Sequence, residues 1–202
     1  MKGKIFVLCG KSASGKDTLM TKILGTAGTN KTIGKLPSIT TRPMRPGEVD
    51  GKEYHFVNEE TFNTLVEEGT VNCVREYETA RGKWKYGKLP SSLQLMDDVI
   101  TIGDIDCIKE LRRVYGADNV IGIYLSASKE CRHMRALMRA GWENFDEEEW
   151  NRREEDDITK YAARYVNKYC KFIINTENAT PVQLYTKFKL AYDLLKGGVK
   201  II

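Results

Sequence analysis

Short apolar runs alternate along the chain with longer segments in which apolar residues recur every three or four positions. Four runs are hydrophobic over most of a strand length, at residues 4–9, 98–102, 120–125 and 170–175. Such runs are typical of strands buried on both faces of a parallel sheet. Helical spacing occurs at residues 19–24, 59–69, 108–115, 128–141 and 181–195. This alternation predicts a three-layer α/β fold with a parallel central sheet.

Capping residues mark several helix ends. Either Ser126 or Ser128 suits the start of the helix that Gly141 ends. The acidic run 146–149 indicates the first turn of a further helix, because carboxylates interact favourably with a helix N-terminus. Pro181 suits the first turn of the last helix.

Residues 35–90 do not continue the alternation. Three prolines and two glycines exclude a helix over residues 37–56, and residues 71–77 have an extended pattern. Little room for a buried parallel strand is left between Tyr54 and Tyr86. We therefore predict that residues 35–90 form an insertion with its own small sheet and one helix.

The composition limits the classes of function. The chain has 202 residues, of which 41% are hydrophobic and 30% are charged, and this suits one domain with a full core and small insertions. The net charge of +4 is small, and the basic residues do not run in blocks, so nucleic acid is not an expected partner. A local cationic site for an anionic substrate agrees with the same total.

Neither the cysteines nor the apolar runs point to export. The five cysteines are odd in number and form no C-x-x-C pair, so the sequence predicts neither a disulfide framework nor a zinc site. The N-terminus has no signal-type apolar core, and no apolar run approaches ~20 residues. We therefore expect a reduced, cytoplasmic protein without a membrane partner, whose oligomeric state the sequence leaves open.

The stretch 10–18 carries the first clear chemical signal. Gly10, Gly15 and Lys16 have the spacing of a P-loop, in which backbone N–H groups surround phosphate oxygens and the lysine reaches the β- and γ-phosphates. The strand before it and the helix after it supply the context that this motif requires. The alternative is a glycine- and serine-rich turn that only caps a helix. The expected ATP contacts are Gly10, Ser12, Ala13, Ser14, Gly15, Lys16, Asp17 and Thr18.

Asp17 stands where the motif usually has Ser or Thr. Magnesium accepts oxygen ligands and often keeps waters, so the Asp17 carboxylate could join its shell directly or through a water. Alternatively, Asp17 only stabilises the helix N-terminus. The sequence leaves both alternatives open.

Two further groups of charged residues suit a ligand. Arg42 and Arg45 lie three residues apart, and the planar donor groups of arginine match phosphate oxygens, although a solvated loop would also suit them. Asp104 and Asp106 follow the predicted strand 98–102 directly. They lie at the sheet edge where α/β proteins bind their ligands.

The stretch 38–57, SITTRPMRPGEVDGKEYHFV, resembles the GMP-binding signature of the guanylate kinase family. The serine, T-T-R, the arginine three residues on, G-E, G and Y-x-F occur in the order and spacing of that signature. The resemblance covers nearly the whole chain. It implies a P-loop NTPase core, a GMP-binding insertion and an arginine-bearing lid that closes over ATP.

By this resemblance the core comprises residues 1–34, 91–134 and 156–202, the insertion residues 35–90, and the lid residues 135–155. The implied reaction is a reversible, Mg²⁺-dependent transfer of phosphate from ATP to GMP, which gives ADP and GDP. The implied contacts of the GMP phosphate are Arg42, Arg45, Tyr54 and Tyr86. Those that face the guanine are Ser38, Glu76 and Asp106, and Lys88 and Asp104 are further candidate contacts of GMP. The implied catalytic residues are Lys16, Arg42, Arg135, Arg139 and Arg153.

The chain departs from the family pattern near the base and in the lid. Lys88 stands where the family has a small hydroxyl residue, so it either donates to guanine O6 or turns to solvent. One extra residue lies between Glu76 and Tyr86. The lid segment is also longer, so Arg152 rivals Arg153 for the lid role.

The intact P-loop lysine and the lid arginines favour an enzyme. One alternative is a P-loop kinase that acts on another nucleoside or deoxynucleoside monophosphate, and Lys88 is its main support. The other alternative is a non-catalytic binding module built on the guanylate kinase fold.

Overall fold

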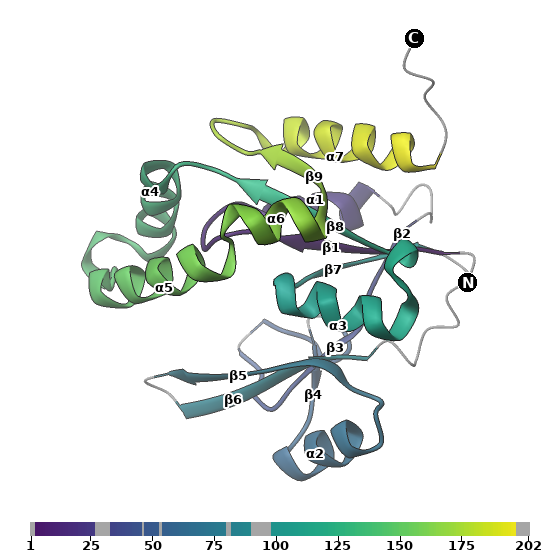
Figure 1. The fold of residues 1–202 in the computed structure, drawn as a ribbon. Helices are drawn as coiled ribbons and strands as arrows, with labels where there is room; N and C mark the ends of the chain where they lie inside the picture. The colour runs from purple at the N-terminus through teal and green to yellow at the C-terminus, as the bar shows by residue number, and fades with distance from the viewer. Residues whose placement is uncertain are drawn as a thin grey trace.

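The computed structural model describes residues 3–26, 33–45, 47–52, 54–79, 82–89 and 98–196. Within them, five parallel strands form the central sheet in the spatial order β2-β7-β1-β8-β9. These strands are β1 (Ile5–Cys9), β2 (Ile33–Lys35), β7 (Asp98–Ile102), β8 (Val120–Ser126) and β9 (Cys170–Asn175). This order places β1 in the middle of the sheet (Figure 1).

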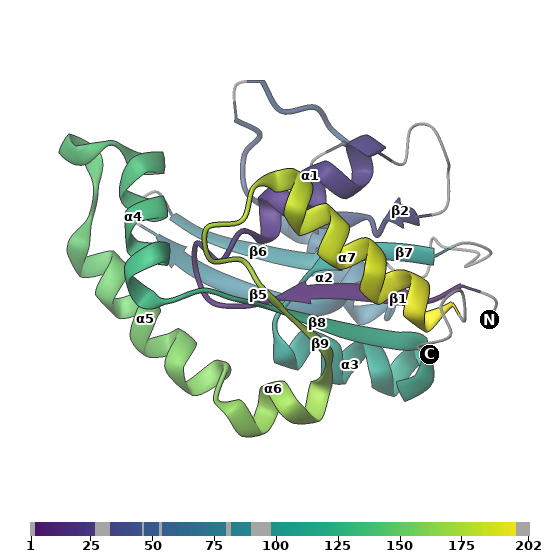
Figure 2. The same ribbon diagram turned by 90° about the horizontal axis from the view of Figure 1, so that it is seen from above.

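Helices cover both faces of this sheet (Figures 1 and 2). One face carries α1 (Lys16–Thr26) and α7 (Pro181–Leu195), and the other carries α3 (Ile105–Tyr115) and α6 (Ala163–Tyr169). The side chains of β1 alternate between the two layers, because successive residues of a strand point to opposite faces. Phe6 and Leu8 pack in one core cluster, and Ile5 and Val7 in the other. The predicted three-layer α/β fold is therefore confirmed.

Between β2 and β7, the described residues form a second sheet of four strands, in the order β4-β3-β6-β5, and we refer to this part of the chain as the insertion. Its elements are β3 (Ser38–Thr40), β4 (His55–Phe56), α2 (Glu59–Glu67), β5 (Asn72–Thr79) and β6 (Gly82–Lys88). Ile39, Phe62 and Val71 form a small core of their own between this sheet and α2. The other side of the sheet faces α3 and the central sheet (Figure 1).

A helical arm, which we define as residues 129–160, extends beyond one end of the central sheet (Figure 2). It consists of α4 (Lys129–Ala140), a 3₁₀ turn (Trp142–Asn144) and α5 (Glu147–Lys160). Ser128 and Asp146 cap the two helices by accepting backbone N–H groups, and Gly141 ends α4 at a φ of 82°. No helix in the described ranges is long and apolar enough to cross a membrane.

Several elements differ in extent from the sequence-based expectations. The helix expected from residue 108 begins at Ile105, because the Asp104 side chain accepts the Cys107 N–H at 2.8 Å and caps it. The extended stretch 71–77 forms β5, but its pairing with β6 is irregular around Cys73, whose φ is 53°. The short strand β2 and the short helix α6 were not expected.

Candidate active site

The loop between β1 and α1 is shaped by its backbone. Gly10 has a φ of 146° and Gly15 a φ of 92°, in a region that residues with a side chain rarely adopt. A Cβ atom at Gly10 would lie 2.5 Å from the carbonyl oxygen of Leu125, so only glycine fits beside β8. Ala13 is left-handed as well, with a φ of 58°. The loop thus leads into the N-terminus of α1, where N–H groups and the helix dipole suit an anion.

Lys16 is the first residue of α1, and its ammonium group lies over the loop. Its Nζ donates to the carbonyl oxygens of Gly10 at 2.7 Å and Lys11 at 2.9 Å. Burial lowers the pKa of Lys16, whereas the carboxylates of Asp157 and Asp17 act in the opposite direction. The loop therefore holds one cation beside its backbone N–H groups.

Asp17 and Thr18 follow in the first turn of α1, and both are exposed. The Asp17 carboxylate makes no hydrogen bond or ion pair with any residue that the structure describes. Within the same residues, no group of three or more His, Cys, Asp or Glu side chains is arranged to hold a metal ion. The Asp17 carboxylate is thus unpaired within the described residues, and its oxygens are open to water or to a cation.

Two carboxylates of α5 contact the loop. Asp157 accepts the backbone N–H of Ser12 at 2.6 Å, and Glu154 accepts Lys11 Nζ at 3.0 Å. Glu154 also forms a buried bidentate pair with Arg132, at 2.6 and 2.9 Å. Burial opposes the charge of Glu154, but the hydrogen bonds from Arg132 and Lys11 hold its pKa at about 2. The Asp157 carboxylate thus already accepts one of the backbone N–H groups of the loop.

Arg135 and Arg139 of α4 differ in their contacts with the loop. Arg135 donates to the hydroxyl and the carbonyl oxygen of Thr176, at 3.1 and 2.6 Å. The Thr176 hydroxyl in turn donates to the carbonyl oxygen of Ser14 at 3.0 Å. Arg139 is exposed in the last turn of α4 and has no polar partner among the described residues.

Arg152 and Arg153 lie on different sides of α5. Both pair with Glu149, at 2.7 and 2.6 Å. Arg153 and Lys160 are seven residues apart and share one helix face, and Lys160 reaches Asp104 of the core at 3.5 Å. Arg152 points to the opposite side from the loop-facing carboxylates of this helix. Arg153 is therefore the one on the side toward the core and the insertion.

On the insertion, Arg42 is held by Glu48. The two terminal nitrogens of Arg42 donate to the two carboxylate oxygens of Glu48 at 3.0 and 2.8 Å, and Arg42 is only 7% exposed. Its guanidinium lies over the rings of Tyr54 and Phe56, 5.8 and 5.4 Å from their centroids. Arg45 is exposed, and its backbone N–H donates to Glu48 at 2.7 Å. One carboxylate therefore fixes the Arg42 side chain and the turn that carries Arg45.

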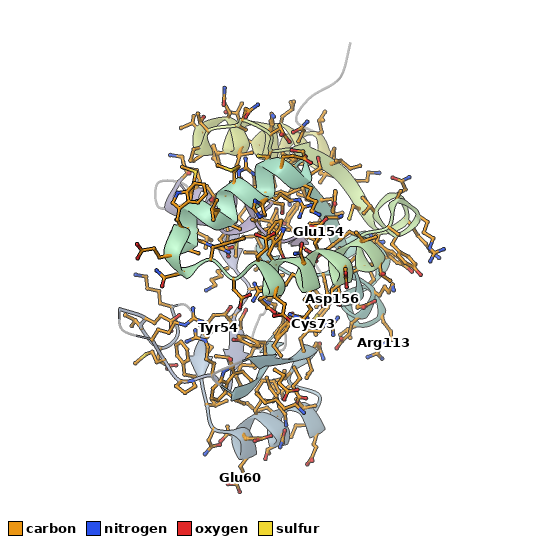
Figure 3. The ribbon with its side chains drawn as sticks, turned by 90° about the vertical axis from the view of Figure 1, so that its left-hand side faces the viewer. Tyr54, Glu60, Cys73, Arg113, Glu154 and Asp156 are labelled. Atoms are coloured by element: carbon orange, nitrogen blue, oxygen red, sulfur yellow. The ribbon has the colours of Figure 1, made fainter. Side chains whose placement is uncertain are left out.

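Three tyrosines cluster on the side of the insertion that faces the core. Tyr86 makes edge-to-face contacts with Tyr54 and Tyr77, at centroid distances of 5.8 and 5.5 Å. Burial raises the pKa of Tyr54, and the neighbouring charges of Tyr86 and Asp17 add to this effect. The Asp17 charge thus acts on a residue of the insertion. Figure 3 shows Tyr54 toward the core, whereas Glu60 of α2 points away from it.

We define the inner face of the insertion by residues Ser38, Arg75, Tyr77, Tyr86 and Lys88. Lys88 pairs with Ser38 across β6 and β3, and its Nζ donates to the Ser38 hydroxyl at 3.0 Å. Lys88 and Tyr86 are two residues apart on one strand, so they point the same way. Burial lowers the pKa of Lys88. The Lys88 side chain is therefore turned inward and not to solvent.

Glu76 lies on the opposite face of β5. The strand register pairs Arg75 with Tyr86 and Glu76 with Lys85, so Arg75 belongs to the inner face and Glu76 to the face toward α2. The Glu76 carboxylate pairs with Lys83 at 2.7 Å, and its side chain is 40% exposed. The structure does not bring Glu76 together with Ser38 and Lys88.

Asp104 and Asp106 have different surroundings. Arg75 donates from Nε and Nη2 to the two oxygens of Asp104, at 3.1 and 2.9 Å. Burial opposes the Asp104 charge, but Arg75 and the Cys107 N–H hold its pKa at about 2. Asp106 is 57% exposed, pairs with Lys109 at 2.8 Å and borders an open groove between α3 and α5.

Four residues of this region lie outside the set predicted from the sequence, namely Glu48, Arg75, Glu154 and Asp157. Glu48 had a visible signal, because it belongs to the signature stretch. Glu154 and Asp157 are three residues apart on one helix face, but the acidic run around them resembles a solvated surface. Arg75 is adjacent to Glu76, and only the strand register separates the two.

Comparisons with known proteins extend these observations. The family model described as guanylate kinase matches residues 2–177. A guanylate kinase of Thermotoga maritima is 31% identical over 150 residues, which cover 71% of this chain and 67% of that protein. A guanylate kinase of Thermus thermophilus is 47% identical over 77 residues, which cover 38% of this chain and 33% of that protein. The match to the Thermus relative thus spans about a third of its length.

A solved structure shows the same fold. The crystal structure of guanylate kinase from Anaplasma phagocytophilum is similar to this chain, with a TM-score of 0.59 and 20% sequence identity. The match covers 98% of this chain and 88% of that chain. At this level of identity, the likeness concerns the arrangement of the elements.

Proposed function

Because the chain belongs to the guanylate kinase family, we propose that it transfers the γ-phosphoryl group of ATP to GMP and forms ADP and GDP. The observation that supports this most directly is a pair of cationic phosphate sites on two parts of the molecule. Lys16 lies over the glycine-rich loop of the core, and Arg42 lies at the edge of the insertion.

The loop after β1 is the proposed site of the ATP phosphates. The backbone N–H groups from Ser12 to Thr18 and the Lys16 ammonium group would surround the β- and γ-phosphates. Asp157 now accepts the N–H of Ser12, so a phosphate oxygen would replace one carboxylate oxygen there. Thr176 and Arg135 border the same loop and would hold its conformation.

The carboxylate of Asp17 fits a magnesium ion that would be bound together with the ATP phosphates. Its oxygens have no partner among the described residues, and magnesium sites commonly use one or two carboxylates together with phosphates and waters. Bound there, the ion would neutralise part of the phosphate charge. The Asp17 carboxylate would contribute one oxygen to it, directly or through a water.

The acceptor phosphate would lie beside Arg42, Arg45, Tyr54 and Tyr86. Arg42 is already oriented by Glu48, burial raises the pKa of Tyr54, and the phenol O–H groups of both tyrosines can donate to a phosphate oxygen. Two highly anionic substrates repel each other, so holding both in line is the main task of the protein. The attacking phosphate oxygen is itself anionic, and no general base is required.

Guanine recognition is proposed for Ser38 and Lys88 on the inner face of the insertion. Lys88 has donors left after its hydrogen bond to Ser38, and guanine O6 and N7 accept readily from lysine. Glu76, Asp104 and Asp106 have other partners in this structure. The inner face is therefore rich in donors.

The helical arm would supply further positive charge at the transferring phosphate. Arg135 lies next to the loop, and Arg139 and Arg153 lie farther out on α4 and α5. We propose that Arg135, Arg139 and Arg153 approach the transferring phosphate when the arm closes. Arg153 takes this role in preference to Arg152, because it shares a helix face with Lys160, which contacts the core.

A second candidate is a kinase of the same family fold that acts on another monophosphate. The inward Lys88 and the outward Glu76 favour it, because the inner face lacks the free carboxylate that would accept the guanine N1–H and N2–H₂ groups.

We further propose that the enzyme works in the cytoplasm. All five cysteines are free thiols, which fits a reducing compartment.

ADP release with a panel of acceptors tests the proposal. The enzyme with ATP and Mg²⁺ would be given GMP, dGMP, AMP, UMP and dTMP in turn. GMP is expected to give the highest kcat/KM. Preference for another base would favour the second candidate, and no stimulation by any monophosphate would favour a non-catalytic module.

A further inference from the structure

An ion cluster joins the three parts of the molecule at one carboxylate. Arg75 of β5 donates to both oxygens of Asp104, which caps the first turn of α3. Lys160, the last residue of α5, lies 3.5 Å from the same carboxylate. The insertion, the core and the arm therefore meet at the side chain of Asp104.

Three hydrogen bonds and one longer ion pair surround the Asp104 carboxylate. One oxygen accepts the Cys107 N–H and Arg75 Nη2, and the other accepts Arg75 Nε and faces Lys160. A carboxylate offers about four lone-pair sites; hydrogen bonds use three of them here, and the Lys160 ammonium group faces the carboxylate at 3.5 Å. Asp104 is therefore a docking point for the neighbouring parts in this arrangement.

Arg75 connects the Asp104 carboxylate to the inner face of the insertion. It lies opposite Tyr86 in the strand register and on the same side as Tyr77. A second contact supports the attachment, because the Cys73 N–H donates to Glu110 of α3 at 2.8 Å. The irregular pairing around Cys73 turns Arg75 inward. The distance from the core to Tyr86 thus depends on the Arg75–Asp104 pair.

We propose that Arg75 is a positioning residue for the acceptor nucleotide. By docking β5 and β6 on α3, it sets where Tyr86 and Lys88 stand relative to the P-loop. This inference rests on the proposed function for the identity of the acceptor. It does not depend on which base the enzyme prefers, because the docking contact lies outside the base-reading groups.

Binding and kinetics of Arg75→Gln test the proposal. GMP binding without ATP would be measured by calorimetry, followed by KM for GMP, KM for ATP, kcat and Tm. We expect GMP affinity to fall about tenfold and KM for GMP to rise by the same factor, with little change in KM for ATP. Arg75→Lys should restore part of the affinity. Arg113→Gln, at an exposed arginine of α3 labelled in Figure 3, is the matched control.

Asp104→Asn provides the second variant, because asparagine still caps α3 but lacks the charge that holds Arg75. The double variant should bind GMP no more weakly than the weaker single variant, since both remove one interaction. Losses that multiply independently would overturn the proposal. So would an Arg75→Gln enzyme that binds GMP like the wild type, or one that loses Tm and retains normal GMP affinity in its folded fraction.

The same measurements separate this proposal from the proposed function. If wild-type enzyme phosphorylates another monophosphate in the panel instead of GMP, the proposed function fails, and the Arg75 variants would be tested with that acceptor. A tenfold loss for the preferred acceptor would still support the positioning role. An unchanged affinity would overturn it.

Discussion

The loop after β1 and the inner face of the insertion reach similar chemistry by different means. The loop depends on its backbone, with glycines at positive φ and N–H groups directed to one point. The inner face depends on side chains of β-strands, where a shift of one residue moves each side chain to the other face. The irregularity at Cys73 decides that Arg75 faces inward and Glu76 outward. The site residues of a loop motif can therefore be inferred directly from the sequence, whereas those of a strand motif can be inferred only when the strand register is known.

Removing the loop cation should have the largest effect. Lys16→Ala is expected to lower kcat by roughly 10²–10³-fold or more, because donors aimed at developing charge are worth about 3–4 kcal/mol each. The Tm without nucleotide should barely change, since the hydrogen bonds of Lys16 to described residues go to the loop carbonyl oxygens of Gly10 and Lys11. Lys171→Ala, at an exposed position of β9, is the control. A variant that keeps about half of its turnover would contradict the P-loop assignment.

Two substitutions on opposite faces of the small sheet sharpen the comparison. Lys88→Ser should lower kcat/KM for GMP about 10- to 100-fold, because the loss of a charged donor costs about 1.5–3 kcal/mol. Glu76→Gln should change it less than about twofold, because an exposed ion pair contributes little. Steady-state kinetics with GMP and dGMP measures both. The reverse order of effects would show that the register does not control base recognition.

Glu48 tests whether the acceptor phosphate site depends on a held arginine. Glu48→Gln keeps an acceptor for Arg42 but removes the charge, and KM for GMP is expected to rise about tenfold with a smaller change in kcat. Glu60→Gln on the outer side of α2 is the matched control (Figure 3). An unchanged KM for GMP would mean that Arg42 is positioned without Glu48.

The smallest effect is expected at Asp17. If its carboxylate joins the magnesium shell, Asp17→Ser should shift the Mg²⁺ concentration for half-maximal rate severalfold, with little change in Tm. A titration of rate against Mg²⁺ at fixed ATP measures this shift. If only the free energy of unfolding falls, by ~0.3–1 kcal/mol, the residue acts on the helix N-terminus alone.

Long elements with a strong pattern could be predicted from the sequence. Four of the five strands of the central sheet, β1, β7, β8 and β9, are largely apolar runs, and the capped helices α4 and α5 begin where Ser128 and the acidic run indicate. The strand β2 (Ile33–Lys35) could not be predicted, because three residues carry no periodicity. Its pairing with β7 is set by tertiary contacts instead.

The residues of the candidate site likewise include some that could be predicted from the sequence and some that could not. Lys16 and Arg42 stand in local motifs, and the structure gives both a defined place. Asp157 could not be assigned, because its contact with Ser12 forms only in the folded chain. Glu48 stands in the signature stretch, but its two hydrogen bonds from Arg42 became visible only in the structure. Arg75 and Glu76 are adjacent. The left-handed backbone of Cys73, three positions before Glu76, determines the face of the sheet to which each side chain points. The local sequence pattern does not indicate a left-handed backbone conformation at a cysteine such as Cys73.

The insertion also interrupts the central sheet between two neighbouring strands. β2 ends at Lys35 and β7 begins at Asp98, yet the two pair side by side. This pairing forms only after the long intervening segment has closed on itself, and the entropy lost on closing a loop grows with its length. A segment that has first collapsed around Ile39, Phe62 and Val71 is effectively shorter. The small core should therefore speed the folding of a sheet to which it contributes no strand.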